Sequence, residues 1–164
     1  MKNIFPFLLV IAALSCNNPA DKTQALQDRV DSLQKKLDQS YKPGLGEFMS
    51  TIQVHHAKLW FAGQNQNWAL ANFETGEIKE ALDGILQYCT DRPELQKLPM
   101  INPAMDSIGL AISAKNQQQF KSSFVLLTAT CNNCHRASNH SYNVIKIPET
   151  PPFSNQAFTA HLPD

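Results

Sequence analysis

The chain has 164 residues, with 14 basic and 14 acidic side chains that leave a formal net charge of zero. This balance excludes the strongly basic surface with which proteins neutralise nucleic-acid phosphates, so we expect no nucleic-acid partner. The chain has only four cysteines, too few to suggest the disulfide framework of a small secreted scaffold. Its length is sufficient for one domain with a single hydrophobic core.

The N-terminus has the pattern of an export signal. Lys2 is followed by an apolar run from Ile4 to Leu14, which is too short to span a bilayer and is typical of the core of a signal peptide. The segment Ala13-Leu14-Ser15-Cys16 then resembles the lipobox of bacterial lipoproteins. We therefore predict a lipoprotein signal peptide at residues 1–15 and a lipid anchor on Cys16; cleavage by ordinary signal peptidase is the alternative. Both predict an extracytoplasmic location in the bacterial cell envelope, and neither decides between inner and outer membrane.

A polar segment without glycine or proline follows at residues 21–41. Leu26, Val30, Leu33 and Leu37 recur at alternating steps of four and three, which is the seam of a coiled coil extending over about two heptads. We predict that residues 16–44 form a lipid-anchored linker and a helical stalk. The pattern leaves open whether the stalk forms a homo-oligomer or is a solitary helix. Lys42-Pro43-Gly44 marks the predicted domain boundary.

Residues 45–139 predict an all-α domain. Apolar residues at helical spacing indicate four helices, at residues 46–63, at 68–88, after Asn102-Pro103 and after Asn116. Asn102 and Asn116 fit N-cap positions, and Gly63 is expected to end the first helix. Residues 90–102, which contain two prolines, are predicted as an irregular connection. Short connections favour an antiparallel four-helix bundle.

The last helix carries the segment Cys131-Asn132-Asn133-Cys134-His135. Residues at i, i+3 and i+4 of a helix share a face, so two thiols can reach two vinyl groups of a porphyrin while the imidazole reaches its iron. The two cysteines also continue the apolar stripe of Phe120, Phe124 and Leu127. We predict one covalent haem c, bound by Cys131 and Cys134, with His135 as the proximal iron ligand. A thiol pair or another metal site is the alternative.

A bundle with this motif late in its last helix resembles the cytochrome c′ type of haem protein. The resemblance covers residues 45–139 and implies a haem in the interior of the bundle. For the distal side of the iron, His56 is the first candidate and Met49 the second, because both lie on the predicted interior face of the first helix. A histidine that merely hydrogen-bonds a neighbour or a haem propionate is the alternative for His56.

Several charged and histidine side chains lie near these elements in the sequence. Lys58 and Arg136 are candidates for pairing with haem propionates, with a solvated surface position as the alternative. His140 follows the motif too closely to be expected over the opposite face of the haem. Residues 140–164 are predicted as an extended, proline-rich tail lying on the bundle, with five apolar anchors: Val144, Ile145, Ile147, Phe153 and Phe158.

These features predict a membrane-anchored monohaem cytochrome c that carries single electrons between extracytoplasmic redox protein partners. The alternative is cytochrome c′-like binding of nitric oxide or another small gas at five-coordinate haem. A third reading is an exported helical protein without haem. A non-enzymatic electron carrier is favoured over an enzyme, since the sequence has no phosphate-binding glycine loop and no nucleophile elbow.

Overall fold

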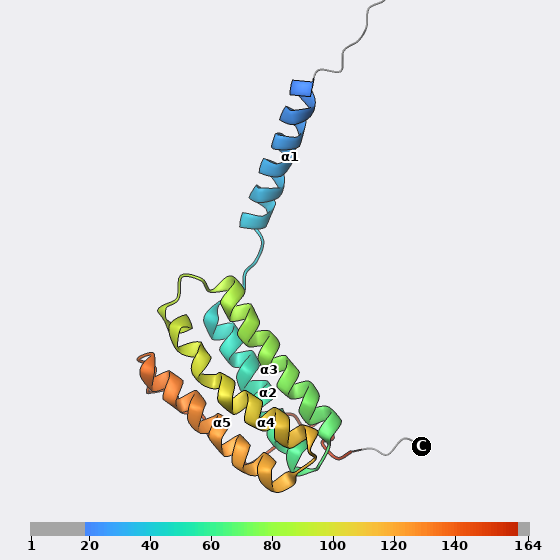
Figure 1. Ribbon diagram of the computed structural model, residues 1–164, viewed down its shortest axis with the longest axis vertical. Helices are drawn as coiled ribbons and strands as arrows, with labels where there is room; N and C mark the ends of the chain where they lie inside the picture. The colour runs from blue at the N-terminus through green and yellow to red at the C-terminus, as the bar shows by residue number, and fades with distance from the viewer. Residues whose placement is uncertain (1–18, 161–164) are drawn as a thin grey trace, which may run out of the picture. The chain divides into compact units, whose positions relative to one another are not determined.

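The computed structural model describes residues 19–160 (Figure 1). Within this range the chain forms five α-helices and one 3₁₀ helix and no strand, which confirms the all-α prediction. The predicted signal peptide, the predicted lipid anchor on Cys16 and the last four residues lie outside the described range. The chain divides into two units, Met1–Tyr41 and Lys42–Asp164.

The first unit contains α1 (Pro19–Asp38), within the segment where the stalk helix was expected. Three glutamine–aspartate hydrogen bonds between residues four apart, at 2.8–2.9 Å, support the helix locally. Two lysines in its last turn complement the negative end of the helix dipole. The four residues of the predicted seam, Leu26, Val30, Leu33 and Leu37, are all exposed. Pairing of this seam stays a prediction.

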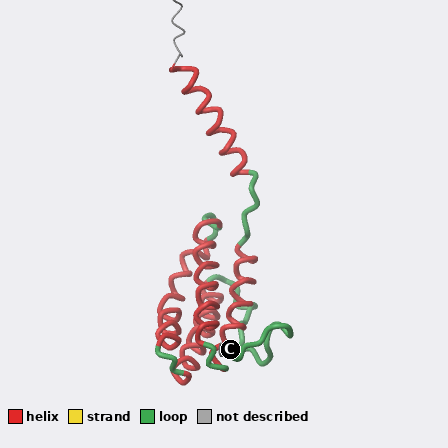
Figure 2. Tube along the Cα trace, turned by 90° about the vertical axis from the view of Figure 1, so that its right-hand side faces the viewer, coloured by secondary structure: helices red, strands yellow, loops and turns green. Residues whose placement is uncertain are grey.

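The second unit is built from α2 (Leu45–Gln64), α3 (Trp68–Tyr88), η1 (Pro93–Ile101), α4 (Asn102–Ser113) and α5 (Gln117–Ala137). Helix α2 packs against α3 and α5, and α4 packs against α3 and α5. Consecutive α-helices of this unit run in opposite directions (Figure 1), and Figure 2 shows helices and loops but no strand in the part of the chain that it colours. This arrangement is compatible with a helical bundle.

The connection between α3 and α4 differs from the expectation. Residues 93–101 form the 3₁₀ helix η1, where an irregular segment was predicted. Pro93 occupies the first turn, where its fixed φ and missing N–H are tolerated. Leu98 and Ile101, three residues apart, are both buried, as the three-residue turn of a 3₁₀ helix allows. The connection therefore contributes to the core, packing against α3, α4 and α5.

Side-chain caps begin two of the helices. The Asn67 side chain accepts a hydrogen bond from the Leu70 amide at 3.1 Å, and the Asn116 side chain accepts one from the Gln119 amide at 3.0 Å. The N-cap expected at Asn116 is confirmed. At α4 the expectation is off by one residue, because Asn102 is already the first residue of the helix.

The expected role of Gly63 is wrong. Helix α2 continues to Gln64, and the left-handed residue beyond its end is Gln66, with φ of 55°. Gly63 is buried inside the helix, and the ring of Phe120 occupies the space where a Cβ on Gly63 would lie. The glycine therefore serves the close approach of an α5 side chain to α2 and does not end the helix.

The core of the second unit is aromatic where α2 meets α5. Phe120 and Phe124 are fully buried, and their ring centroids are 6.0 Å apart. The Trp60 ring lies 4.8 Å from the Phe124 ring. Leu127 continues this buried stripe, and Cys131 follows it, half-buried. The stripe that the sequence predicted along the last helix is thus present in the structure.

Residues 140–160 form neither helix nor strand. Of the five expected anchors, Phe158 is buried and its ring lies 5.7 Å from the Phe61 ring. Ile145 and Ile147 are half-buried, whereas Val144 and Phe153 are exposed. The apolar residues of this segment therefore do not all face the helices.

Candidate functional site

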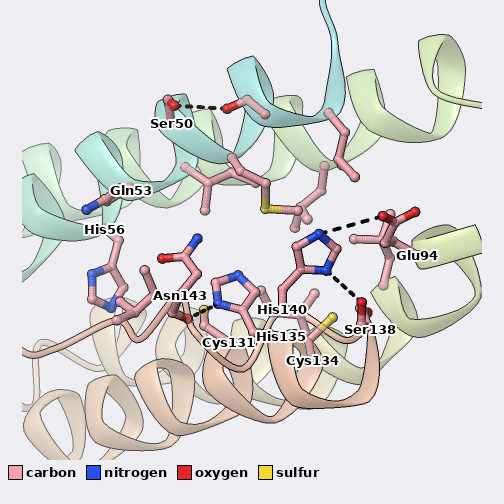
Figure 3. A pocket seen from close by; sticks show the side chains of 18 of the residues that line it. Ser50, Gln53, His56, Glu94, Cys131, Cys134, His135, Ser138, His140 and Asn143 are labelled. Atoms are coloured by element: carbon pink, nitrogen blue, oxygen red, sulfur yellow. Dashed lines mark hydrogen bonds and ion pairs between the residues drawn. The ribbon is translucent and has the colours of Figure 1, made fainter. Parts of the chain in front are cut away.

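A cavity of about 260 Å³ lies between α2, η1, the end of α5 and the chain that follows α5 (Figure 3). Figure 3 shows the rings of His56, His135 and His140 turned toward the space between the α2 and α5 ribbons. Much of the wall is apolar, with side chains from four elements: Leu45, Ile52, Leu82, Leu98, Ile101 and Ile145. Cys131, Cys134 and His135 all line this cavity, so the three motif side chains face one space.

Both cysteines of the motif are free thiols. Burial, and to a smaller extent the neighbouring Cys134, raise the pKa of Cys131 to about 11. Burial also raises the pKa of Cys134, whose Sγ lies 3.8 Å from the Lys97 carbonyl oxygen in η1. The two sulfurs are therefore protonated at neutral pH.

His135 is oriented by the chain beyond α5. Its Nδ1 lies 2.7 Å from the Asn143 carbonyl oxygen. A carbonyl oxygen can only accept, so we assign the proton to Nδ1, which leaves the lone pair on Nε2. This is the arrangement in which protein histidines bind metals: one ring nitrogen donates to a fixed acceptor and the other ligates.

His56 lies on α2 and is 4 % exposed. Its Nε2 is 2.9 Å from Thr128 Oγ1, and that hydroxyl lies 2.9 Å from the Phe124 carbonyl oxygen. Since the hydroxyl donates to the carbonyl, it accepts from His56 Nε2–H. Burial lowers the pKa of His56 to about 4, so the ring is neutral at pH 7. The hydrogen-bonded core histidine foreseen as an alternative is thus what the structure contains.

The second distal candidate, Met49, lines the same cavity. The structure therefore brings both distal candidates, His56 and Met49, together with the three motif residues around one space. Iron ligation by either residue stays a prediction.

Sequence reasoning missed a polar group at this cavity. His140, Glu94 and Arg92 all line it. His140 Nε2 lies 3.9 Å from Glu94 Oε1, and Arg92 Nε lies 3.8 Å from Glu94 Oε2. His140 follows the motif closely in sequence, and Asn139, with a φ of 62°, turns the chain back so that His140 lines the cavity. An asparagine just beyond the last helix was the available signal for this reversal.

The two candidates for propionate pairing are engaged elsewhere. Arg136 hydrogen-bonds Asn133 on the outer side of α5. Lys58 Nζ lies 2.9 Å from Glu74 Oε1, and His55 Nδ1 lies 2.6 Å from Glu74 Oε2. Glu74 is fully buried between α2 and α3, and the sequence analysis did not single it out. Neither Lys58 nor Arg136 lines the cavity.

No protein-family model, no curated protein and no solved structure matches the chain. Among residues 19–160, no three histidine, cysteine, aspartate or glutamate side chains are grouped to hold a metal ion by themselves. No helix in that range is both long and apolar enough to cross a membrane.

Proposed function

We propose that this protein is a membrane-anchored monohaem cytochrome c that carries single electrons between extracytoplasmic redox proteins. One haem c would be attached through Cys131 and Cys134, with His135 as the proximal iron ligand. The bound haem would supply the one-electron chemistry, and the chain would supply ligands, burial and hydrogen bonds. The observation that supports this is the convergence of all three motif side chains on one cavity.

The residues around the cavity fit such a group. The sulfurs are free, the His135 Nε2 lone pair is available, and the apolar wall suits the flat apolar body of a porphyrin. Arg92 and His140 could interact with its carboxylates. The volume of about 260 Å³ lies just below the usual range for small-molecule sites, roughly 300 to 1,000 Å³, so a haem bound there would keep part of its surface outside the cavity.

The thiol chemistry argues against a redox-active dithiol. Such cysteines have a lowered pKa and commonly lie at the N-terminus of a helix, where the dipole stabilises the thiolate. Here burial raises the pKa of Cys131 to about 11, and the motif lies in the last turns of α5. Protonated, buried thiols are poor nucleophiles for disulfide exchange.

The finer architecture belongs to the same proposal. The helices of the second unit would form the antiparallel four-helix bundle of cytochrome c′-type proteins, with the proline-rich chain beyond residue 140 covering one side. Cys16 would carry the lipid that holds the protein at the cell envelope, and α1 would act as the stalk. The exposed seam of α1 would allow homo-oligomer formation.

One observation favours the second function, gas binding. His56 Nε2 is engaged by Thr128 Oγ1, so His56 would have to give up this bond to ligate iron through Nε2. If it keeps the bond and Met49 does not bind, the iron is five-coordinate and its distal side is open to nitric oxide.

Absorption spectroscopy tests these proposals. The mature chain is expressed with a haem-attachment system, and spectra of the oxidised and reduced protein are recorded with and without nitric oxide. Low-spin covalent haem supports electron transfer, and a high-spin spectrum that responds to the gas supports the second function. A double variant with Cys131→Ser and Cys134→Ser is the control and should lack covalent haem. A colourless wild-type protein with the mass of the polypeptide alone would overturn the haem proposal.

Single variants identify the distal ligand. If His56 ligates, His56→Ala converts low-spin iron to high-spin, and Met49→Ala leaves the spectrum unchanged. Thr128→Val keeps the shape of its side chain but removes the hydroxyl, so it frees His56 Nε2. A spectrum that is insensitive to His56→Ala would remove His56 from this role.

A further inference from the structure

The Asn132 side chain of α5 holds the chain that returns after that helix. Asn132 Nδ2 donates to the Ile145 carbonyl oxygen at 2.8 Å, and the Ile145 amide donates to Asn132 Oδ1, also at 2.8 Å. The carboxamide therefore pairs with both polar groups of one residue, as a neighbouring β-strand would. Both bonds are partly buried, which protects them from competition by water.

This pairing lies beside the contact that orients His135. Asn143, two residues before Ile145, provides the carbonyl oxygen that accepts from His135 Nδ1 at 2.7 Å. Asn132 lies three residues before His135, so both side chains project from neighbouring turns of α5 toward the same returning segment. In the described residues, the next hydrogen bond from this segment to the helices comes only at Thr159, whose carbonyl oxygen accepts from Asn67 Nδ2.

We propose that Asn132 is a positioning residue for the proximal histidine. By holding Ile145, it keeps the Asn143 carbonyl oxygen against His135 Nδ1 and thereby selects the tautomer with its lone pair on Nε2. The inference rests on the proposed haem ligation by His135 and gives a role to a motif position that haem attachment itself leaves free to vary.

The pairing would also influence the iron. A histidine that donates from Nδ1 to a fixed carbonyl is a more basic ligand, which favours the oxidised metal. Loss of the pairing would let residues 143–145 move away from α5 and weaken this donation. The reduction potential should then rise. Loss of such an outer partner commonly costs about tenfold in metal affinity, and a tenfold change in preference for one oxidation state is about 59 mV for a one-electron couple.

The test compares Asn132→Ala with Asn133→Ala in the mature haem-loaded protein. Asn133 is the matched control, because it is the other variable motif position, is exposed and hydrogen-bonds only within α5, to Arg136. Both variants retain Cys131, Cys134 and His135. We expect a raised reduction potential in Asn132→Ala alone. Amide hydrogen exchange at Ile145 should also be roughly tenfold faster in this variant, a factor that corresponds to the net free energy of about one hydrogen bond. Asn132→Asp keeps an acceptor for the Ile145 amide but loses the donor, so it should be intermediate.

Nitrogen NMR of the haem-free chain at about pH 8, where histidines are ordinarily neutral, separates this inference from the haem proposal. Wild type and Asn133→Ala should have the His135 proton on Nδ1, and Asn132→Ala should show a mixture of tautomers. If Asn132→Ala matches wild type in tautomer and in Ile145 exchange, the positioning role is wrong even if haem is bound. If wild type takes up no haem, the haem proposal fails and the tautomer result still decides the role of Asn132. Circular dichroism verifies that each variant is folded, and Asn132→Asp serves if Asn132→Ala is not.

Discussion

The buried His56 should make the free energy of unfolding depend on pH, and replacing it with glutamine should remove most of this dependence. Burial lowers the pKa of His56 from 6.5 in the unfolded chain to about 4 in the folded one. Between these values the unfolded chain binds more protons than the folded chain, so the free energy of unfolding rises with pH. The difference of about two and a half pH units corresponds to roughly 3 kcal/mol, at about 1.4 kcal/mol per unit. This stability is fully present above pH 6.5 and is lost as the pH falls to about 4.

Urea unfolding of the haem-free chain at several pH values between 4 and 7, followed by circular dichroism, measures the effect. Other groups also titrate in this window, so the informative quantity is the difference between wild type and His56→Gln. That difference should shrink by up to about 3 kcal/mol as the pH is lowered. Met49→Leu is the matched control, because it changes the same cavity wall without removing a titratable group. Parallel pH profiles for wild type and His56→Gln would refute the assigned burial and neutrality of this histidine.

Two further predictions concern packing and buried charge, both measured by urea unfolding at pH 7. Gly63→Ala should lower the free energy of unfolding by about 1–3 kcal/mol, because its Cβ meets the Phe120 ring. Gly76→Ala, in α3 with open space around it, should instead be neutral or stabilise by up to about 1 kcal/mol; equal effects at the two glycines would contradict the packing argument. Lys58→Met should cost about 3–5 kcal/mol, because it leaves the fully buried Glu74 carboxylate without its ammonium partner. A loss below about 1 kcal/mol would show that this pair is not buried as described.

Much of the helical organisation could be predicted from local patterns. The expected helix at residues 68–88 coincides with α3, and the first helix differs from α2 by one residue at each end. Asn116 caps α5 as expected. Such features depend on spacing and on hydrogen bonds between residues three or four apart, so they are visible in the sequence.

The missed features depend on residues that are distant in sequence. Gly63 has the residue type of a helix end, but its neighbour Phe120 determines its role. Glu74 is buried because Lys58 and His55 of another helix meet it. His140 reaches the cavity through a reversal at Asn139. None of these contacts has a periodic signal.

The candidate site also has some features that the sequence predicted and others that it did not. The motif predicted Cys131, Cys134 and His135 as haem-binding residues, and the face of the first helix indicated His56 and Met49; the structure places all five around one cavity. A hydrogen bond of His56 was among the alternatives, but its partner, Thr128, could not be identified from the sequence because it belongs to a helix far away in the chain. The acceptor for His135 comes from a segment without regular structure, for which sequence periodicity gives no information.

The close packing of the Cys134 sulfur against η1 has a bearing on the order of assembly. In the folded chain this sulfur lies 3.8 Å from the Lys97 carbonyl oxygen, and Cys131 beside it is half-buried. Buried, protonated sulfurs resist oxidants, and they react slowly with an incoming vinyl group for the same reason. Under the proposed function, the thioether bonds would therefore form on a newly exported polypeptide before η1 closes over the last turns of α5. The connection between α3 and α4 would then fold against a haem that is already bound.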